Sequence, residues 1–174
     1  MTERNRRELL EWGKALLVAL VLALAIRSFL LQPYWVLGRS MLPTLHDGER
    51  VFLNRLVYRL QDPVRGDVVV IPLPDEDISI IKRVIGLPGE SVEIREGSVW
   101  INGQRLLEPY LEGDTQGEYG PVEVPAGHVF VLGDNRQESR DSRYASIGFV
   151  EFERLTGKAI LVYWPLTHLR TIPR

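Results

Sequence analysis

The sequence predicts an all-β fold of antiparallel sheets, packed as a partly closed barrel or sandwich and preceded by one N-terminal transmembrane helix. Short runs rich in Val, Ile and aromatic residues recur between Gly and Pro residues, which is typical of strands joined by turns. One long apolar run precedes them, and no second helical period follows it. We therefore expect a cytoplasmic N-terminus over residues 1–12, a membrane anchor over 13–31 and an extracytoplasmic β domain over 32–174.

The first element is the apolar segment near the N-terminus. Residues 15–26 are all apolar, and a helix over 13–31 has nineteen residues, about 28 Å against a bilayer core of about 30 Å. Basic residues cluster at its start, namely Arg4, Arg6, Arg7 and Lys14. Because positive charge favours the cytoplasmic side, we expect the N-terminus in the cytoplasm and the remainder on the outer face of the cell membrane.

A cleavable secretion signal is the alternative interpretation of this segment. The arginines would form its basic region, and Ala23-Leu24-Ala25 would be its small-x-small cleavage site. Periodicity does not separate the two interpretations. Tyr34 and Trp35 follow the segment, as aromatic side chains do at a membrane–water interface, although an ordinary linker would carry them equally.

The elements after the anchor are short strands. We expect them at residues 51–53, 67–71, 78–85, 91–94, 98–101, 122–124, 128–132 and 158–164. Asn102-Gly103 predicts a type I′ hairpin, Glu96-Gly97 predicts a second tight hairpin, and residues 151–155 predict a short turn. Strands of this length need a second sheet to bury their faces, which favours packed antiparallel sheets.

The amino-acid composition excludes several classes of function and several kinds of site. A formal net charge of −2 over 174 residues, with no basic cluster, gives no general attraction to nucleic acid. The chain has no cysteine, so disulfides, thiol nucleophiles and thiolate metal sites are excluded. The three histidines, His46, His128 and His168, are isolated from one another in the sequence. We therefore expect neither a metal site nor a cofactor.

Ser40 and Lys82 are the candidate catalytic residues. A serine hydroxyl is a poor nucleophile until a base takes its proton, and the sequence shows neither Ser-His-Asp spacing nor Gly-x-Ser-x-Gly. In a strand, Lys82 shares a face with Ile80 and Val84, and burial among apolar groups favours the neutral form that a base requires. Taken alone, Ser40 fits the cap of a helix or turn better than a nucleophile, and Lys82 fits an edge-strand lysine that limits aggregation better than a base.

Three segments carry motifs in a fixed order. They are Gly38-Arg39-Ser40-Met41-Leu42-Pro43-Thr44-Leu45, Ile81-Lys82-Arg83-Val84-Ile85-Gly86-Leu87-Pro88-Gly89-Glu90 and Gly133-Asp134-Asn135-Arg136-Gln137-Glu138-Ser139-Arg140-Asp141-Ser142-Arg143. In that order they resemble the nucleophile motif, the general-base motif and the C-terminal signature of bacterial type I signal peptidases, also called leader peptidases. Together with the anchor, the resemblance covers most of the chain.

The resemblance implies that Ser40 is the nucleophile and Lys82 its general base. It also implies that Met41 and Pro43 help to shape the substrate pocket. Gly38 stands where many members of the family carry a serine whose hydroxyl helps to hold the oxyanion. Here the oxyanion would depend on a backbone N–H, that of Ser40, with water as a further candidate donor.

The resemblance further implies supporting roles for the third motif and for Arg83, which follows the base. Ser139 would hydrogen-bond the lysine and orient it. Asp141 and Arg143 would pair to brace the site, with Asp134 close to them.

The implied function is a membrane-anchored serine endopeptidase that cleaves N-terminal signal peptides from exported preproteins after a small-x-small motif such as Ala-x-Ala. Its partners would be those preproteins and the lipid bilayer, with no nucleic acid. A self-cleaving repressor of the DNA-damage response shares the Ser-Lys chemistry but would carry an Ala-Gly site before the serine, whereas Ala126-Gly127 lies far downstream. In an anchored β-domain adaptor, Ser40 and Lys82 would be structural.

Overall fold

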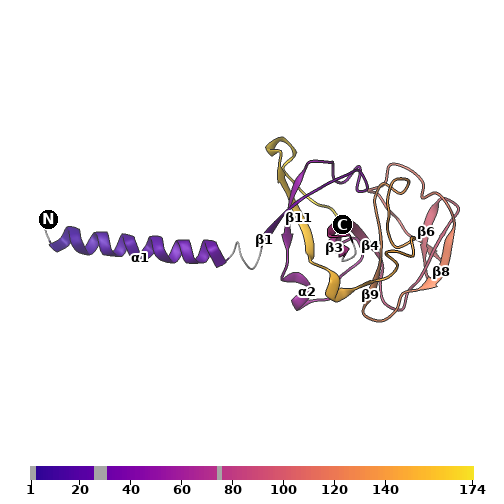
Figure 1. Cartoon of the computed structure of the whole chain (residues 1–174), viewed down its shortest axis with the longest axis horizontal. Helices are drawn as coiled ribbons and strands as arrows, with labels where there is room; N and C mark the ends of the chain where they lie inside the picture. The colour runs from indigo at the N-terminus through magenta and orange to yellow at the C-terminus, as the bar shows by residue number, and fades with distance from the viewer. Residues whose placement is uncertain (1–2, 26–30, 74–75) are drawn as a thin grey trace.

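The computed structural model describes residues 3–25, 31–73 and 76–174, which form a long helix and a β domain (Figure 1). Helix α1, Glu3–Ala25, extends away from the domain. No helix within these ranges is both long and apolar enough to cross a membrane. The expected anchor over 13–31 is wrong at its far end, because Leu31 begins strand β1 opposite Asn54. The part of the expected anchor at 26–30 lies outside the described residues.

The β domain consists of two antiparallel sheets, which confirms the predicted all-β fold. The larger sheet has eight strands in the order β1-β2-β11-β3-β4-β9-β10, with β12 beside β11, and the smaller has four in the order β7-β6-β5-β8. Among the described strands, β1 and β10 at the two ends of the larger sheet do not pair with each other, so the barrel is not closed.

The strands of the larger sheet are β1 Leu31–Trp35, β2 Arg50–Asn54, β3 Val68–Leu73, β4 Ile78–Gly86, β9 His128–Leu132, β10 Val150–Glu151, β11 Gly157–Trp164 and β12 Arg170–Thr171. Those of the smaller sheet are β5 Ser91–Arg95, β6 Ser98–Ile101, β7 Gln104–Arg105 and β8 Tyr119–Glu123. Within the described residues, three short helical turns accompany them: α2 Val57–Leu60, η2 Phe152–Arg154 and η3 Leu166–His168. Every expected strand overlaps an observed one, whereas β1, β7, β10 and β12 were not expected.

The two predicted hairpin turns are confirmed. Glu96 and Gly97 join β5 to β6 with φ angles of 51° and 71°, and Asn102 and Gly103 join β6 to β7 with φ angles of 50° and 76°. Two consecutive positive φ angles define the type I′ turn, whose twist matches that of the flanking strands. The turn expected at 151–155 is the 3₁₀ helix η2.

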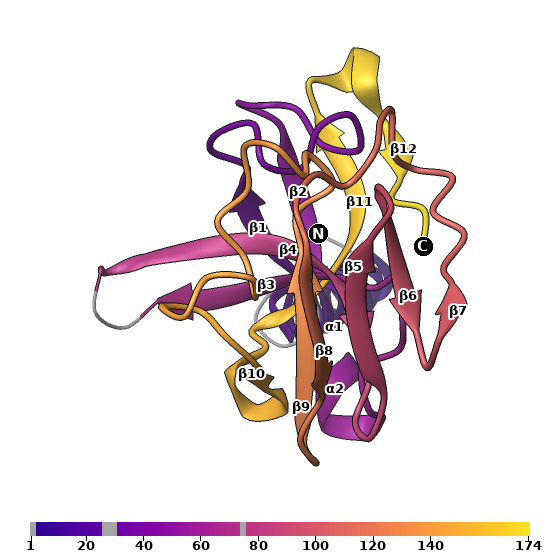
Figure 2. The same cartoon turned by 90° about the vertical axis from the view of Figure 1, so that its right-hand side faces the viewer.

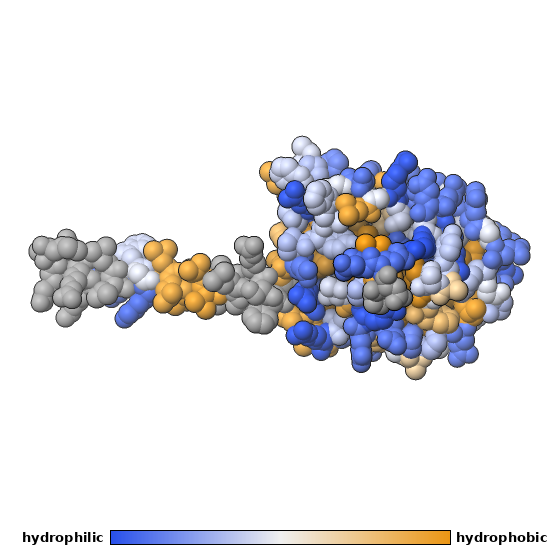
Figure 3. Space-filling model, in the orientation of Figure 1, coloured by the Kyte–Doolittle hydropathy of each residue, from blue (hydrophilic) through white to orange (hydrophobic). Residues whose placement is uncertain are grey.

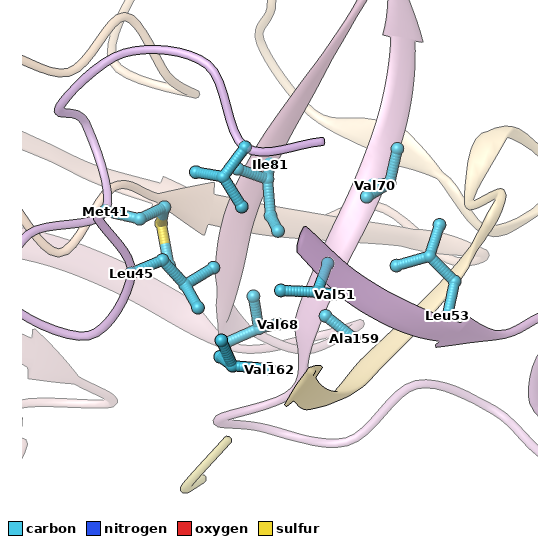
Figure 4. Packing of buried hydrophobic residues seen from close by; sticks show 10 residues of the cluster. Met41, Leu45, Val51, Leu53, Val68, Val70, Ile81, Ala159 and Val162 are labelled. Carbon is cyan, nitrogen blue, oxygen red and sulfur yellow. The ribbon is translucent and has the colours of Figure 1, made fainter. Parts of the chain in front are cut away.

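Three clusters of buried apolar side chains form the core. The first lies between β2, β3, β4, β11 and the loop after β1, and contains Val36, Met41, Leu45, Val51, Leu53, Val68, Val70, Ile81, Ala159 and Val162 (Figure 4). The second packs on the opposite face of β3 and β4 and includes Val69, Ile71 and Val84. The third fills the space between the two sheets around Ile85, Val92 and Phe130. The first cluster matters for function because it anchors the loop that carries Ser40.

Strand β4 is longer than its neighbour β9, and this difference positions the site. The hairpin of β3 and β4 projects from the domain as a long ribbon (Figure 2). Its partner β9 pairs with β4 only from Arg83 to Gly86, opposite Leu132 to Phe130. Within the described sheet, the earlier half of β4, up to Lys82, therefore pairs with β3 alone. In this half of β4, no described strand pairs with the edge that faces away from β3.

Candidate active site

Ser40 and Lys82, which are 42 residues apart in the sequence, are in hydrogen-bond contact. The Lys82 Nζ donates to Ser40 Oγ at 2.7 Å and to the carbonyl oxygen of Ile81 at 2.9 Å. Lys82 is only 3% exposed. The side chain leaves β4 on the face that also carries Ile80 and Val84 of the second core cluster, as the alternation of the strand predicts.

The loop from Val36 to Glu49 presents Ser40 to this lysine. Two backbone hydrogen bonds close the loop at its base: the Val36 N–H donates to the Glu49 carbonyl oxygen, and the Gly48 N–H donates to the Val36 carbonyl oxygen. Met41 is 1% exposed and Leu45 is fully buried, so these two side chains fix the loop in the first core cluster (Figure 4). The Ser40 side chain, between these anchors and the base of the loop, turns toward Lys82.

The environment of Lys82 favours its neutral form. Burial lowers the pKa of its ammonium from 10.5 to about 8. The carboxylates of Asp141 and Asp134 raise the pKa and so oppose this effect, while the charge of Arg140 lowers it further. Burial exceeds the attraction of the two carboxylates because a buried ammonium loses its hydration. A large fraction of Lys82 is therefore able to accept a proton near pH 8.

Arg83 and Asp134 join the lysine strand to the third motif. Arg83 Nε lies 2.8 Å from Asp134 Oδ1, Arg83 Nη2 lies 2.7 Å from Asp134 Oδ2, and both side chains are completely buried. Thr44 donates its hydroxyl to the same Asp134 Oδ2 at 2.5 Å. Thr44 belongs to the Ser40 loop, so this cluster ties all three motifs together. Asp134 thus pairs with Arg83 rather than with the Asp141–Arg143 pair.

Asp141 and Arg143 form the expected pair. Arg143 Nε lies 2.8 Å from Asp141 Oδ1, and Arg143 Nη2 lies 2.9 Å from Asp141 Oδ2. Asp141 also accepts from the Gly133 N–H at 3.0 Å, and Arg143 donates to the carbonyl oxygen of Arg136 at 2.8 Å. The pair thus fixes the fold of the third motif, at one remove from Ser40 and Lys82.

Ser139 is buried beside the site, but its hydroxyl is not bonded to Lys82. Its Oγ has no hydrogen-bond partner within the described part of the chain, although the side chain is 4% exposed. It packs against Gly133, where an added Cβ would also lie 2.5 Å from the Ser40 carbonyl oxygen. The lysine instead donates to Ser40 and to Ile81. The orienting role inferred for Ser139 remains a prediction.

The two residues inferred for a substrate pocket lie in different surroundings. Pro43 and Leu42 line a surface pocket of about 280 Å³ together with Asp134 and Asn135. Met41 is instead buried in the first core cluster and does not line this pocket. Its side chain supports the loop from beneath.

The backbone N–H of Ser40 has no hydrogen-bond acceptor among the described residues. Gly38 adopts a φ of 86° and donates its N–H to Asp47 Oδ1 at 2.8 Å, and the Ser40 carbonyl oxygen accepts from Asn135 N–H at 3.0 Å. The Ser40 N–H is therefore available to an oxygen that approaches the serine.

Sequence reasoning missed several polar side chains of this region. Arg136 is buried and pairs with Glu108, and Tyr110 places its ring 3.9 Å from the Arg83 guanidinium. Thr44 and Arg136 lie inside the quoted motifs, so their position was a usable signal. Glu108 and Tyr110 lie in a loop between β7 and β8, which offered no pattern.

Comparison with known proteins identifies the family of this site. The family model for signal peptidase, peptidase S26, matches residues 9–164. The chain belongs to this family. It is 42% identical to a signal peptidase I of Bacillus licheniformis over 98% of both chains, and 44% identical to signal peptidase I T of Bacillus subtilis strain 168 over 92% of this chain and 88% of that protein.

A solved structure agrees with this family membership. The crystal structure of a signal peptidase I from Enterococcus faecalis V583 matches with a TM-score of 0.50 at 36% sequence identity. The match covers 56% of this chain and 97% of that one. The resemblance to bacterial type I signal peptidases that the three motifs suggested is therefore confirmed, and with it the prediction that the chain is a peptidase.

Proposed function

We propose that this signal peptidase cleaves the signal peptides of exported preproteins with Ser40 as nucleophile and neutral Lys82 as general base. The observation that carries the proposal is the hydrogen bond of 2.7 Å between Lys82 Nζ and Ser40 Oγ. The lowered pKa of Lys82, about 8, supports the same assignment because only a neutral amine accepts a proton.

The proposed reaction proceeds through an acyl-enzyme. Lys82 Nζ takes the hydroxyl proton as Ser40 Oγ attacks the carbonyl carbon of the scissile bond. The negative charge that develops on the carbonyl oxygen is stabilised by the free Ser40 N–H. The protonated Lys82 then gives its proton to the leaving amine of the mature protein. Water, activated by the neutral lysine, hydrolyses the ester and releases the signal peptide.

The substrate would be cut after a small-x-small motif, such as Ala-x-Ala. The family membership supports this preference. The surface pocket beside Leu42 and Pro43 adjoins the nucleophile loop and lies within reach of an extended chain bound there.

We infer that the enzyme works as a single-pass membrane protein, with residues 1–12 in the cytoplasm, an anchor segment that starts at residue 13 and ends before strand β1, and the β domain outside. Apolar side chains gather along the described part of α1 (Figure 3), and those of Leu16 to Val21 include several that are more than half exposed. On the β domain, Trp35 and Trp164 are 57% and 48% exposed and flank Arg50, whose guanidinium lies 5.3 Å and 5.8 Å from their rings. Exposed tryptophans beside a cation suit a membrane interface.

The catalytic assignment is tested by cleavage of an Ala-x-Ala preprotein in detergent. We expect wild-type enzyme to release the mature protein, and we expect Ser40→Ala and Lys82→Ala each to lower the rate by at least about 1,000-fold because nucleophile and base act as one unit. The double variant should be scarcely slower than either single variant. Circular dichroism of each variant controls for folding. Substantial turnover by a folded Ser40→Ala protein would reject the assignment and favour a structural role for Ser40.

The topology is tested separately with the Ser40→Ala protein, which cannot cut its own Ala23-Leu24-Ala25 segment. We expect this protein to sediment with membranes, to retain residues 1–25 by N-terminal sequencing, and to be digested only by protease added from outside. A mature N-terminus at Ile26 would instead identify the segment as a removable signal.

A further inference from the structure

The last residues of the chain contact the Ser40 loop and the Lys82 strand. Strand β12 pairs with β11 through Arg170 and Val162, and the chain then passes beside the nucleophile loop. Further on, the carbonyl oxygen of Pro173 accepts from Arg83 Nη1 at 2.8 Å. A displacement of the C-terminal segment would therefore also displace the strand that carries Lys82 and the loop that carries Ser40.

Arg170 makes three hydrogen bonds to the Ser40 loop. Its Nη2 donates to the carbonyl oxygen of Thr44 at 2.7 Å and to Glu49 Oε2 at 2.8 Å, and its Nη1 donates to Glu49 Oε1 at 2.8 Å. Thr44 follows Ser40 by four residues, and Glu49 closes the loop at its base. A single guanidinium thus spans the half of the loop that follows the nucleophile, with the bidentate geometry that makes arginine–carboxylate pairs strong.

Glu49 is a suitable anchor for this guanidinium because it is buried and charged. Its side chain is 1% exposed and also accepts from the His46 N–H at 3.0 Å and lies 2.8 Å from His168 Nδ1. Burial disfavours the carboxylate, but the hydrogen bonds from Arg170, His46 and His168 outweigh burial and keep the pKa of Glu49 below its ordinary value. The Arg170–Glu49 pair therefore stays ionised at neutral pH.

Thr44 is held from two sides. Arg170 binds its carbonyl oxygen, and its hydroxyl donates to Asp134 at 2.5 Å. The carbonyl of Ser40 itself is held by the Asn135 N–H. Without Arg170, the contacts with Asp134 and Asn135 would remain. The loop would lose the hydrogen bonds that hold the Thr44 carbonyl oxygen and the Glu49 carboxylate to the C-terminal segment.

We propose that Arg170 is a positioning residue for the nucleophile: it holds the Ser40 loop through Thr44 and Glu49 so that Ser40 Oγ stays within hydrogen-bond reach of Lys82. The proposal rests on the proposed role of Ser40. Arg170 contacts neither Ser40 nor Lys82 in the described structure, so it acts on the turnover step through the loop and does not bind the proton.

The test compares Arg170→Ala and Arg170→Lys with Arg154→Ala in the full-length enzyme, using an Ala-x-Ala peptide substrate. Arg154 is a matched control because its Nη2 also donates to a backbone carbonyl, that of Pro72, at 3.1 Å, away from the Ser40 loop. Rates are measured at one common temperature, well below the lowest unfolding midpoint of the set, where every variant is folded. This choice removes any loss of activity that merely follows global stability.

We expect Arg170→Ala to lower kcat roughly 10- to 100-fold with KM changed less than about twofold, because small displacements of a reacting group have effects of this size. The kcat of Arg170→Lys should lie between those of wild type and Arg170→Ala, since an ammonium keeps the charge but cannot form the bidentate pair of a guanidinium. Arg154→Ala should match wild type. The pH midpoint of kcat/KM should stay in place, because the groups that set the pKa of Lys82 are untouched.

Four results would overturn the positioning role: an unchanged kcat in Arg170→Ala, a change in KM alone, a shifted pH midpoint, or an equal loss in Arg154→Ala. These outcomes are distinct from failure of the proposed function itself. That failure would appear as an inactive wild type or an active Ser40→Ala protein in the same assay.

Discussion

Arg83 and Asp134 form a bidentate ion pair in which neither side chain has any solvent exposure. Arg83 is the residue after the proposed base, and Asp134 also accepts from Thr44 of the nucleophile loop. The pair therefore sets the distance between the strand that carries Lys82 and the loop that carries Ser40. Its geometry is a condition for the contact of 2.7 Å between the two catalytic candidates.

This relationship predicts a large loss of stability when one partner is removed. We expect Arg83→Ala and Asp134→Ala each to lower the free energy of unfolding by about 3–5 kcal/mol, because each leaves an uncompensated buried charge. Urea denaturation measures the difference. Arg140→Ala is the control: its ion pair with Glu76 is exposed, so we expect little change. Equal effects at the buried and the exposed pair would contradict this account.

The pH dependence of cleavage follows from the pKa of Lys82, about 8. Because the proposed base acts as the neutral amine, kcat/KM should fall about tenfold per pH unit well below this value and level off above it. Arg140 lowers this pKa, so Arg140→Gln should move the midpoint to higher pH. A rate that is flat across this range, or that falls as pH rises, would exclude neutral Lys82 as the base.

The same pKa predicts that Lys82 destabilises the fold at neutral pH. The folded-state pKa, about 8, lies below the ordinary value of 10.5, so the cost is absent above 10.5, grows as pH falls and is complete below 8. This difference corresponds to about 3 kcal/mol, reduced by the hydrogen bonds that the variant loses. We expect Lys82→Met to be more stable than wild type at pH 7 and to lose this advantage near pH 10.5.

Lys158 provides a contrast for the stability measurement. Its Nζ lies 2.6 Å from the buried carboxylate of Asp67. Lys158→Met removes a partner of that carboxylate, so we expect it to be less stable than wild type at pH 7 in the same urea titration. Stabilisation by both lysine replacements would indicate a general effect of the methionine side chain.

Gly133 allows no side chain. A Cβ there would collide with the Ser139 hydroxyl and lie 2.5 Å from the Ser40 carbonyl oxygen. We therefore expect Gly133→Ala to lower kcat/KM at least about tenfold by displacing Ser40. Ser139→Gly added to this variant should not restore the rate, since the contact with the Ser40 backbone remains. Gly13→Ala in helix α1, whose Cβ would also meet no atom within 4 Å, should behave as wild type.

Most of the fold could be predicted because the strands alternate and their turns carry Gly and Asn. Strand β1 was missed since it contains Pro33, which usually argues against a strand. Proline is tolerated there because β1 lies at the edge of its sheet. The predicted anchor was too long at its C-terminal end. The apolar side chain of Leu31 continues the apolar helical segment in the sequence, and only its pairing with Asn54 shows that it belongs to a strand.

Some features of the candidate site could likewise be predicted from the sequence, and others could not. Alternation in the strand predicted which face Lys82 occupies, and the motif resemblance linked it to Ser40. The contact of Arg170 with Thr44 joins residues 126 positions apart. No local pattern marks such a contact, because tertiary packing brings the C-terminal strand to the loop. The same holds for the Tyr110 ring over Arg83.

Because Lys82 and Arg83 are neighbours in β4, the register of this strand must be kept to the residue. Successive strand residues point to opposite faces, so the lysine meets Ser40 while the arginine meets Asp134. Inserting or deleting one residue just before this pair would swap the two cations between faces. A guanidinium, which does not release its proton in proteins, would then face the serine, and the ammonium would face the carboxylate. Such an insertion or deletion would abolish the proposed catalysis, although the serine and the lysine would both remain in the sequence.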